Sequence, residues 1–199
     1  MTIKYSISWF NPKNFRKYLS HLTNNENNFL EIGSFEGQST NFFIDTFFKN
    51  KKSKITCIDP WIKYSEATIT NMPNWDNFIN EETYDIFVNN TYNNKDNIII
   101  KRGLSQDIIP SLPNNHYNFV LIDGDHSEDA VWMDATYSFP KLKADGIMIF
   151  DDYDWSSGKC NPKLAIDRFI GEYKNKIKIL GLPPDTGNQV VVQKINNEN

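Results

Sequence analysis

The stretch FLEIGSFEGQST, residues 29–40, joins a short apolar run to a carboxylate, two glycines and several small polar residues. An apolar run that ends in glycine and is followed by a helical pattern is typical of a strand leading into a helix. Glycine is expected where φ is positive or where another body comes close to the main chain, as at Gly33 and Gly37. The first N–H groups of the following helix have no partner within the helix. The stretch therefore predicts a strand, a special turn and a helix start that can bind a ligand.

Four further apolar runs have the length of buried strands. Near-continuous apolar runs of this kind are typical of strands covered on both faces, as in a parallel sheet. The five runs are NFLEIG (28–33), KITCID (54–59), the weaker NIIIKRG (97–103), NFVLID (118–123) and GIMIFDD (146–152). Helix-length segments lie between them, including 39–50 and 127–143, where Ser127 is a candidate N-cap and Pro140 is expected to kink or end the helix.

The last forty residues follow a different rhythm. Residues 162–176 predict a helix, and 177–182 and 188–195 predict two strands that are separated only by PPDTG. Strands joined so closely must be antiparallel, because a parallel crossover needs about a dozen residues or more. We therefore predict an α/β fold: a Rossmann-like, doubly wound, mostly parallel seven-stranded sheet with a C-terminal antiparallel hairpin. A single domain is expected over 1–199, with residues 62–96 as a lid or side wall.

Composition limits the function classes. The formal net charge is −4 and the pI about 5.4, which disfavours a nucleic-acid partner. The two cysteines, Cys57 and Cys160, are too few for a disulfide framework, and no apolar stretch is long enough to span a bilayer. The first residues lack a signal-peptide core, so a cytoplasmic protein without membrane contact is expected. A homo-oligomer is compatible with the sequence.

The ends of the first two strands suggest a nucleoside-bearing cofactor. Ligands of doubly wound sheets bind beyond the carboxyl ends of the strands, and Asp59 ends the second strand 26 residues after Gly33. A carboxylate there can accept hydrogen bonds from both hydroxyls of a ribose. A dinucleotide fingerprint would require glycines where Phe35 and Gln38 stand, so a nicotinamide cofactor is disfavoured. The alternative is that Gly33 and Gly37 only form a tight turn and that Asp59 is a turn residue.

Acidic residues follow the fourth and fifth strands. Parallel neighbours would bring Asp123, Asp125, His126, Asp151 and Asp152 to one rim of the sheet. Crowded carboxylates have raised pKa values unless a counter-charge is present, and a divalent cation with oxygen ligands supplies one. Such a cation can orient an acceptor hydroxyl and lower its pKa. The alternative is that these acids are N-caps and turn residues.

Four stretches together resemble the class I S-adenosylmethionine-dependent methyltransferases, closest to the small metal-dependent O-methyltransferases of sugars and antibiotics. The stretches are FLEIGSFEGQST, ITCIDPW, IIIKRGLSQDIIPSLP and the run from Tyr117 to Tyr153, and they cover roughly residues 29–153. Leu104 departs from the pattern, since relatives often carry an acid there beside the adenine.

The resemblance implies roles for individual residues. It implies that Asp59 holds the ribose with Trp61 beside it, that Gly103 and Ser105 approach the adenine, and that Asp123 closes the methionine end. The methionine part would be lined by Glu31, Gly33, Ser34 and Gly37. The same resemblance implies Asp123, Asp151 and Asp152 as ligands of Mg²⁺ or another divalent cation, and Asp125 as the general base. His126 is a second candidate base, because its unperturbed pKa lies near neutrality.

The expected function is Mg²⁺-assisted methyl transfer from S-adenosylmethionine to a hydroxyl of a sugar, another small polyol or a phenol. The expected partner is thus a small-molecule or glycan acceptor. Two alternatives remain from other classes: a cofactor-binding partner subunit that has lost catalysis, and an NAD-dependent oxidoreductase. The complete acidic set disfavours the first alternative, and the absent glycines disfavour the second.

Overall fold

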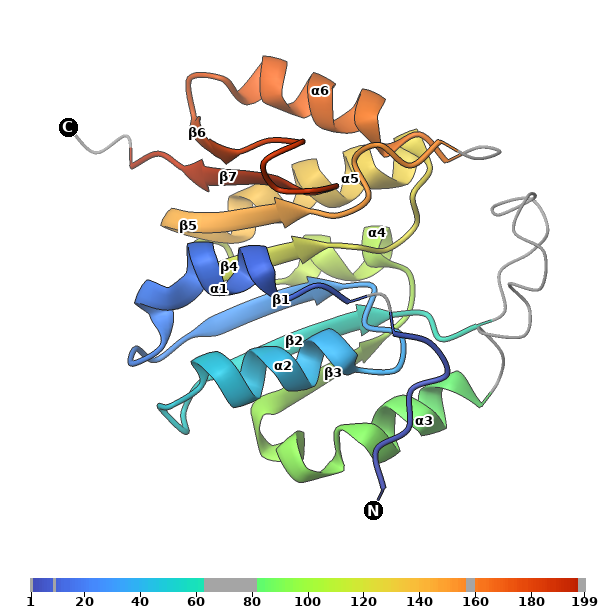
Figure 1. Cartoon of the computed structure of the whole chain (residues 1–199). Coiled ribbons are helices and arrows are strands. Elements are labelled where there is room, and N and C mark those ends of the chain that lie inside the picture. The colour runs from blue at the N-terminus through green and yellow to red at the C-terminus, as the bar shows by residue number, and fades with distance from the viewer. Residues whose placement is uncertain (1, 9, 63–81, 157–159, 197–199) are drawn as a thin grey trace.

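A computed structural model gives the structure of the chain and describes residues 2–8, 10–62, 82–156 and 160–196. A seven-stranded sheet runs through the molecule in the order β3-β2-β1-β4-β5-β7-β6 (Figure 1). The strands are β1 (Asn28–Ile32), β2 (Lys54–Asp59), β3 (Ile98–Arg102), β4 (Tyr117–Ile122), β5 (Leu142–Phe150), β6 (Ile177–Gly181) and β7 (Val190–Lys194).

The pairing of the strands confirms the predicted mixed sheet. Strands β1 to β5 are parallel to one another, whereas β7 pairs antiparallel with both β5 and β6. From β1 the chain moves outward to β2 and β3 and then returns to the other side of β1 with β4. The strand order therefore reverses between β1 and β4, which is where ligands bind in open α/β sheets.

Helices cover both faces of the sheet (Figure 1). The α-helices are α1 (Lys13–Leu19), α2 (Gln38–Phe47), α3 (Thr83–Asn90), α4 (Ser105–Ile108), α5 (Glu128–Ser138) and α6 (Pro162–Tyr173). Short 3₁₀ turns are η1 (Ser20–Leu22), η3 (Tyr92–Asn97), η4 (Ile109–Ser111) and η5 (Phe139–Lys141). Among the described residues, no helix is both long and apolar enough to cross a membrane.

Strand β4 shows why the apolar runs are nearly continuous. Phe119 and Leu121 pack in a core with α1, α2 and α3, while Val120 and Ile122 pack in a second core with α5 and α6. Successive side chains of a strand point to opposite faces, so a strand covered on both sides needs apolar residues at every position. The edge strand β3 is mostly exposed, which explains its weaker pattern.

The ends of α5 are as predicted. Ser127 Oγ accepts a hydrogen bond from the N–H of Ala130 at 3.4 Å, with Glu128 and Asp129 in the first turn. The helix ends at Ser138, and Pro140 lies in the 3₁₀ turn that follows.

Part of the predicted lid at 62–96 lies outside the described residues, which exclude 63–81. Its described part forms α3 and η3. Phe87 of α3 is fully buried in the same core as α2, so this part of the segment packs on one face of the sheet.

Candidate active site

A cavity of about 350 Å³ lies at the carboxyl ends of the central parallel strands. Its lining comes from four connections and from the N-terminal segment, which we define as residues 2–8 together with Phe10. After β1 the cavity is lined by Gly33, Ser34, Phe35, Glu36, Gln38 and Ser39, and the connection from β2 to α3 contributes Asp59 and Thr83. The turn after β4 contributes Asp123, Gly124, Asp125 and His126, and the connection after β5 contributes Asp151, Asp152, Trp155 and Cys160. The N-terminal segment contributes Tyr5, Ile7 and Phe10.

Gly33 stands where two turns meet. Its φ is +87°, and a Cβ on it would lie 1.9 Å from the carbonyl oxygen of Asp123. Gly33 also donates its N–H to Ile58 at 2.9 Å. Glycine is therefore required here because the main chain of Asp123 and Gly124 lies too close to permit a side chain. Gly33 also lines the cavity.

Gly37 has the positive φ that was expected, and the body close to it is the chain itself. Its φ is +82°, and a Cβ would lie 2.6 Å from Cγ2 of Thr91 and 3.1 Å from Cδ2 of Phe87. Gly37 is not among the residues that line the cavity. Gly37 thus lets the start of α2 pack against α3, and its contact with the methionine part of the cofactor stays a prediction.

Glu31 lies beneath the turn and is fully buried. Its carboxylate accepts hydrogen bonds from Ser34 Oγ at 2.8 Å, from Ser39 Oγ at 2.5 Å and from Thr40 Oγ1. Burial raises the pKa of Glu31 despite these donors. Through these bonds Glu31 fixes the turn whose Ser34 and Ser39 line the cavity, and its own contact with the cofactor stays a prediction.

Asp59 connects the end of β2 to the same turn. Its Oδ2 accepts the N–H groups of Ser34 at 3.1 Å and Phe35 at 2.9 Å, and its Oδ1 accepts the N–H of Trp61 at 2.7 Å. Burial raises the pKa of Asp59. Asp59 lines the cavity while it also holds the turn through these three N–H groups, and its contact with a ribose stays a prediction. Trp61 is buried, and its indole N–H donates to the carbonyl of Phe35 at 2.7 Å, so it supports the turn from outside the cavity lining.

Gly103 and Ser105 lie at the same edge of the sheet, but outside the described cavity lining. The N–H of Gly103 donates to the carbonyl of Asp59 at 3.1 Å. Ser105 hydrogen-bonds to Asp134 of α5, which is buried. Burial raises the pKa of Asp134 to about 7, and its Oδ1 has no partner among the described residues.

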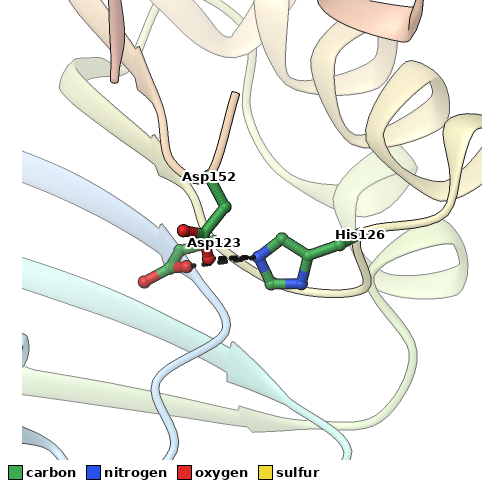
Figure 2. Close-up of side chains that lie close together, drawn as sticks. All are labelled: Asp123, His126 and Asp152. Atoms are coloured by element: carbon green, nitrogen blue, oxygen red, sulfur yellow. Dashed lines mark ion pairs between the residues drawn. The ribbon is translucent and has the colours of Figure 1, made fainter. Parts of the chain in front are cut away.

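The most concentrated chemistry lies at the ends of β4 and β5. His126 Nε2 lies 3.1 Å from Oδ2 of Asp152 and 3.7 Å from Oδ1 of Asp123, and Figure 2 shows both carboxylates directed at this nitrogen. Burial, together with the charge of Asp151, raises the pKa of Asp123 to about 8. Burial by itself would lower the pKa of His126, but the two carboxylates outweigh it and raise the pKa to about 10. The imidazolium therefore acts as a counter-charge for the acids.

Asp151 and Asp125 line the same cavity but have local partners. Asp151 accepts hydrogen bonds from Gln189 Nε2 at 3.0 Å and from the N–H of Asp152 at 2.9 Å. Asp125 accepts the N–H of Ser127 at 2.8 Å, which places it in the turn before α5. Of the three predicted metal ligands, Asp123 and Asp152 lie together with His126. One possible ligand atom from each of these residues lies within 4.8 Å of the other two. Asp151 is not part of this group.

Two parts of the site were missed from the sequence. Trp155 lies with its ring centroid 4.6 Å from that of His126 and lines the cavity. The N-terminal segment contributes Tyr5, Ile7 and Phe10. A signal existed for the second, because Tyr5 and Ile7 alternate with serines as in a strand with one covered face.

The strand order, the reversal between β1 and β4 and the antiparallel β7 define the class I methyltransferase fold. A family model described as a methyltransferase domain matches residues 30–153. The chain belongs to this family of S-adenosylmethionine-dependent methyltransferases.

Solved structures agree on the fold. The O-methyltransferase NovP is 15% identical, with a TM-score of 0.68 over 92% of this chain and 79% of its own. An O-methyltransferase from Bacillus cereus, solved in complex with S-adenosylhomocysteine, is 15% identical with a TM-score of 0.65 over 94% of this chain and 82% of its own. An rRNA methylase from Streptococcus thermophilus is 10% identical with a TM-score of 0.63 over 96% and 100%. Comparison with curated protein sequences gives no match.

Proposed function

We propose that this methyltransferase transfers the methyl group of S-adenosylmethionine to a hydroxyl of a small-molecule acceptor with the help of a bound divalent cation. The observation that carries the proposal is the group of Asp123, His126 and Asp152 beside the turn after β1, in one cavity. Donor and acceptor would thus meet between the ends of β1 and β4. We also propose that a single domain carries the whole site.

The cofactor would occupy the side of the cavity formed by Gly33, Ser34 and Asp59. The described S-adenosylhomocysteine complex of the Bacillus cereus enzyme supports this cofactor. The backbone contact between Gly33 and Asp123 keeps the turns after β1 and β4 at a constant distance. The turn after β1 and the turn after β4, which would contact different parts of the cofactor, therefore fix each other's position.

The residues at the ends of β4 and β5 fit a divalent cation. Two carboxylates and an imidazole converge within 4.8 Å. Burial and the charge of Asp151 raise the pKa of Asp123, so a bound cation would favour its ionised form, and His126 would release its proton to act as a neutral ligand. Carboxylates suit Mg²⁺ and Mn²⁺, while an imidazole ligand also suits other first-row metals. A bound cation would supply Lewis-acid orientation and a lowered pKa for the acceptor hydroxyl.

Proton removal from the acceptor is assigned to Asp125 or His126, which both line the cavity. While His126 is an imidazolium between two carboxylates it is no base, since it already carries the proton. Asp125 is held by the N–H of Ser127, so its carboxylate keeps one orientation at the rim. This favours Asp125 as the group that accepts the hydroxyl proton.

The comparison with an rRNA methylase raises RNA as a second acceptor class. The charge of the cavity disfavours it, because acids line the wall where a phosphate backbone would approach. A partner subunit without catalysis is disfavoured by the intact acidic group. Transfer to RNA or the absence of any transfer are the results that would support these alternatives.

Two measurements test the proposal. S-adenosylhomocysteine should bind in isothermal titration, whereas NAD should not, and methyl transfer to a panel of small hydroxyl compounds should depend on Mg²⁺ or Mn²⁺ and stop with EDTA. The Asp152→Ala variant should lose turnover while its affinity for S-adenosylhomocysteine stays within a few-fold. Unchanged turnover in EDTA would refute the cation, and failure to bind S-adenosylhomocysteine would refute the function.

A further inference from the structure

The N-terminal segment is held against the rim of the cavity by polar side chains from the turn before α2 and from α3. Asn90 mimics a neighbouring strand: its side chain accepts the N–H of Lys4 at 3.0 Å and donates to the carbonyl of Lys4 at 2.8 Å. The carboxylate of Glu36 accepts both the N–H of Ser6 at 2.7 Å and its hydroxyl at 2.6 Å. These bonds attach the main chain at Lys4 and Ser6 to α3 and to the turn before α2.

The side chains that the segment turns toward the cavity are largely apolar. Tyr5 and Ile7 are half-buried and line the cavity, while the intervening Ser6 bonds to Glu36. Phe10 continues this wall, and its ring is stacked against Phe15 at 5.4 Å between centroids, in the core that also contains α2. One wall of the cavity is therefore apolar and anchored in the α1–α2 layer.

A second apolar wall comes from the connection after β5. Trp155 lines the cavity, and its ring is tilted by 49° against the imidazole of His126 at 4.6 Å. The main-chain N–H of Trp155 donates to the main-chain carbonyl of Asp152 at 2.9 Å, so the two residues lie in one tight turn beside His126. Aromatic side chains beside a polar cluster bind flat, apolar bodies that carry a polar end.

The negative charge of the cavity lining disfavours anionic acceptors. Within the described lining no Lys or Arg is present, while the acids are Glu36, Asp59, Asp123, Asp125, Asp151 and Asp152. An anionic group on the acceptor would meet repulsion that no described lining cation other than His126 offsets.

We propose that the acceptor is an uncharged or cationic hydroxyl compound with a flat, apolar ring, and that Ile7, Phe10 and Trp155 select it. This inference rests on the proposed function and narrows it from hydroxyl compounds in general to ring-bearing ones, such as phenols. The hydroxyl points to Asp123, His126 and Asp152, and the ring lies between the N-terminal segment and the indole of Trp155.

The test is a titration of the enzyme loaded with S-adenosylhomocysteine, with and without Mg²⁺. The probes are 4-hydroxybenzyl alcohol as a neutral phenol, methyl glucoside as a neutral polyol, and 4-hydroxybenzoate as the anionic partner of the phenol, compared in EDTA. We expect the phenol to bind about tenfold or more tightly than either of the others. The variants Ile7→Ser and Trp155→Leu should each weaken phenol binding by about fivefold or more, whereas Ile3→Ser, in the same segment but 50% exposed, should not.

The outcomes separate the two proposals. If methyl glucoside or 4-hydroxybenzoate binds as tightly as the phenol, if none of the three binds, or if Ile7→Ser and Trp155→Leu bind the phenol normally, the ring-selecting walls are refuted while the proposed function stands. If S-adenosylhomocysteine itself does not bind the wild-type chain, the proposed function fails and this inference fails with it. Thermal unfolding of each variant identifies any that has lost its fold, and the other variant then decides.

Discussion

The Cα of Gly33 is so close to Asp123 that a Cβ on it would lie 1.9 Å from the carbonyl oxygen of Asp123. The turn after β1 and the turn after β4 thus touch backbone to backbone at the point where the strand order reverses. Since Asp123 also belongs to the acidic group, this contact connects the expected cofactor side to the reacting side.

The contact predicts that Gly33→Ala is severely destabilising. The new methyl group would collide with backbone that cannot rotate away, and the φ of +87° adds strain. We expect a loss of roughly 3 kcal/mol or more in the free energy of unfolding, measured by urea denaturation. The matched control is Gly171→Ala in α6, where nothing lies within 4 Å, and which should be neutral or stabilising by about 0.5–1 kcal/mol. Equal stability of the two variants would show that the turns do not touch in solution.

The burial of Asp134 predicts that the free energy of unfolding of the protein falls as the pH rises. Burial raises its pKa from 3.8 to about 7, so the unfolded chain releases this proton first. The stabilising contribution of the protonated form is complete below about pH 4 and is lost as the pH rises through about 7. Asp134→Asn should thus gain stability relative to wild type at pH 8, up to about 4 kcal/mol, and little at pH 4. Thermal unfolding at both pH values measures it, with the exposed Asp129→Asn as control; a difference that does not change with pH would contradict the prediction.

The group of Asp123, His126 and Asp152 predicts a cation site that one substitution can remove. Asp152→Asn keeps the shape but deletes a negative charge, and we expect Mn²⁺ affinity in isothermal titration to fall about tenfold or more. Asp154→Asn alters an exposed side chain of the same loop and should bind Mn²⁺ like wild type. If both variants bind Mn²⁺ equally, the cation binds elsewhere or not at all.

The hydrogen bonds of Asn90 to Lys4 predict that this side chain keeps the N-terminal segment in place. Asn90→Ala removes both hydrogen bonds to Lys4, so the backbone amides of residues 2–8 should exchange with deuterium at least severalfold faster. Asn89→Ala changes an exposed neighbour on α3 and serves as the control. Unchanged exchange in Asn90→Ala would mean that other contacts hold the segment.

Most of the fold could be predicted because local signals and tertiary structure agree. The apolar runs that became β1, β2, β4 and β5 are covered on both faces, and the short PPDTG connection permits only antiparallel pairing of β6 and β7. Strand β3 was the weakest prediction because an edge strand is covered less.

The site was predicted at the level of strand ends but not of individual contacts. Parallel pairing places Asp59, Asp123 and Asp152 at one rim, as expected. Whether an acid faces the cavity or the chain depends on neighbours that are distant in sequence: Glu31 meets hydroxyls of α2, and Asp151 meets Gln189. The same limit applies to the space beside Gly37, which is filled from α3 and the turn after it.

Because β7 runs antiparallel to β5 and thus to the whole parallel part of the sheet, the chain leaves the sheet near Lys194 at the rim opposite the cavity. The first described residues, in contrast, are bound beside the cavity mouth. A purification tag or fluorescent fusion should therefore be attached at the C-terminal side, since one at the N-terminal side would lie close to Tyr5 and Ile7, which line the cavity.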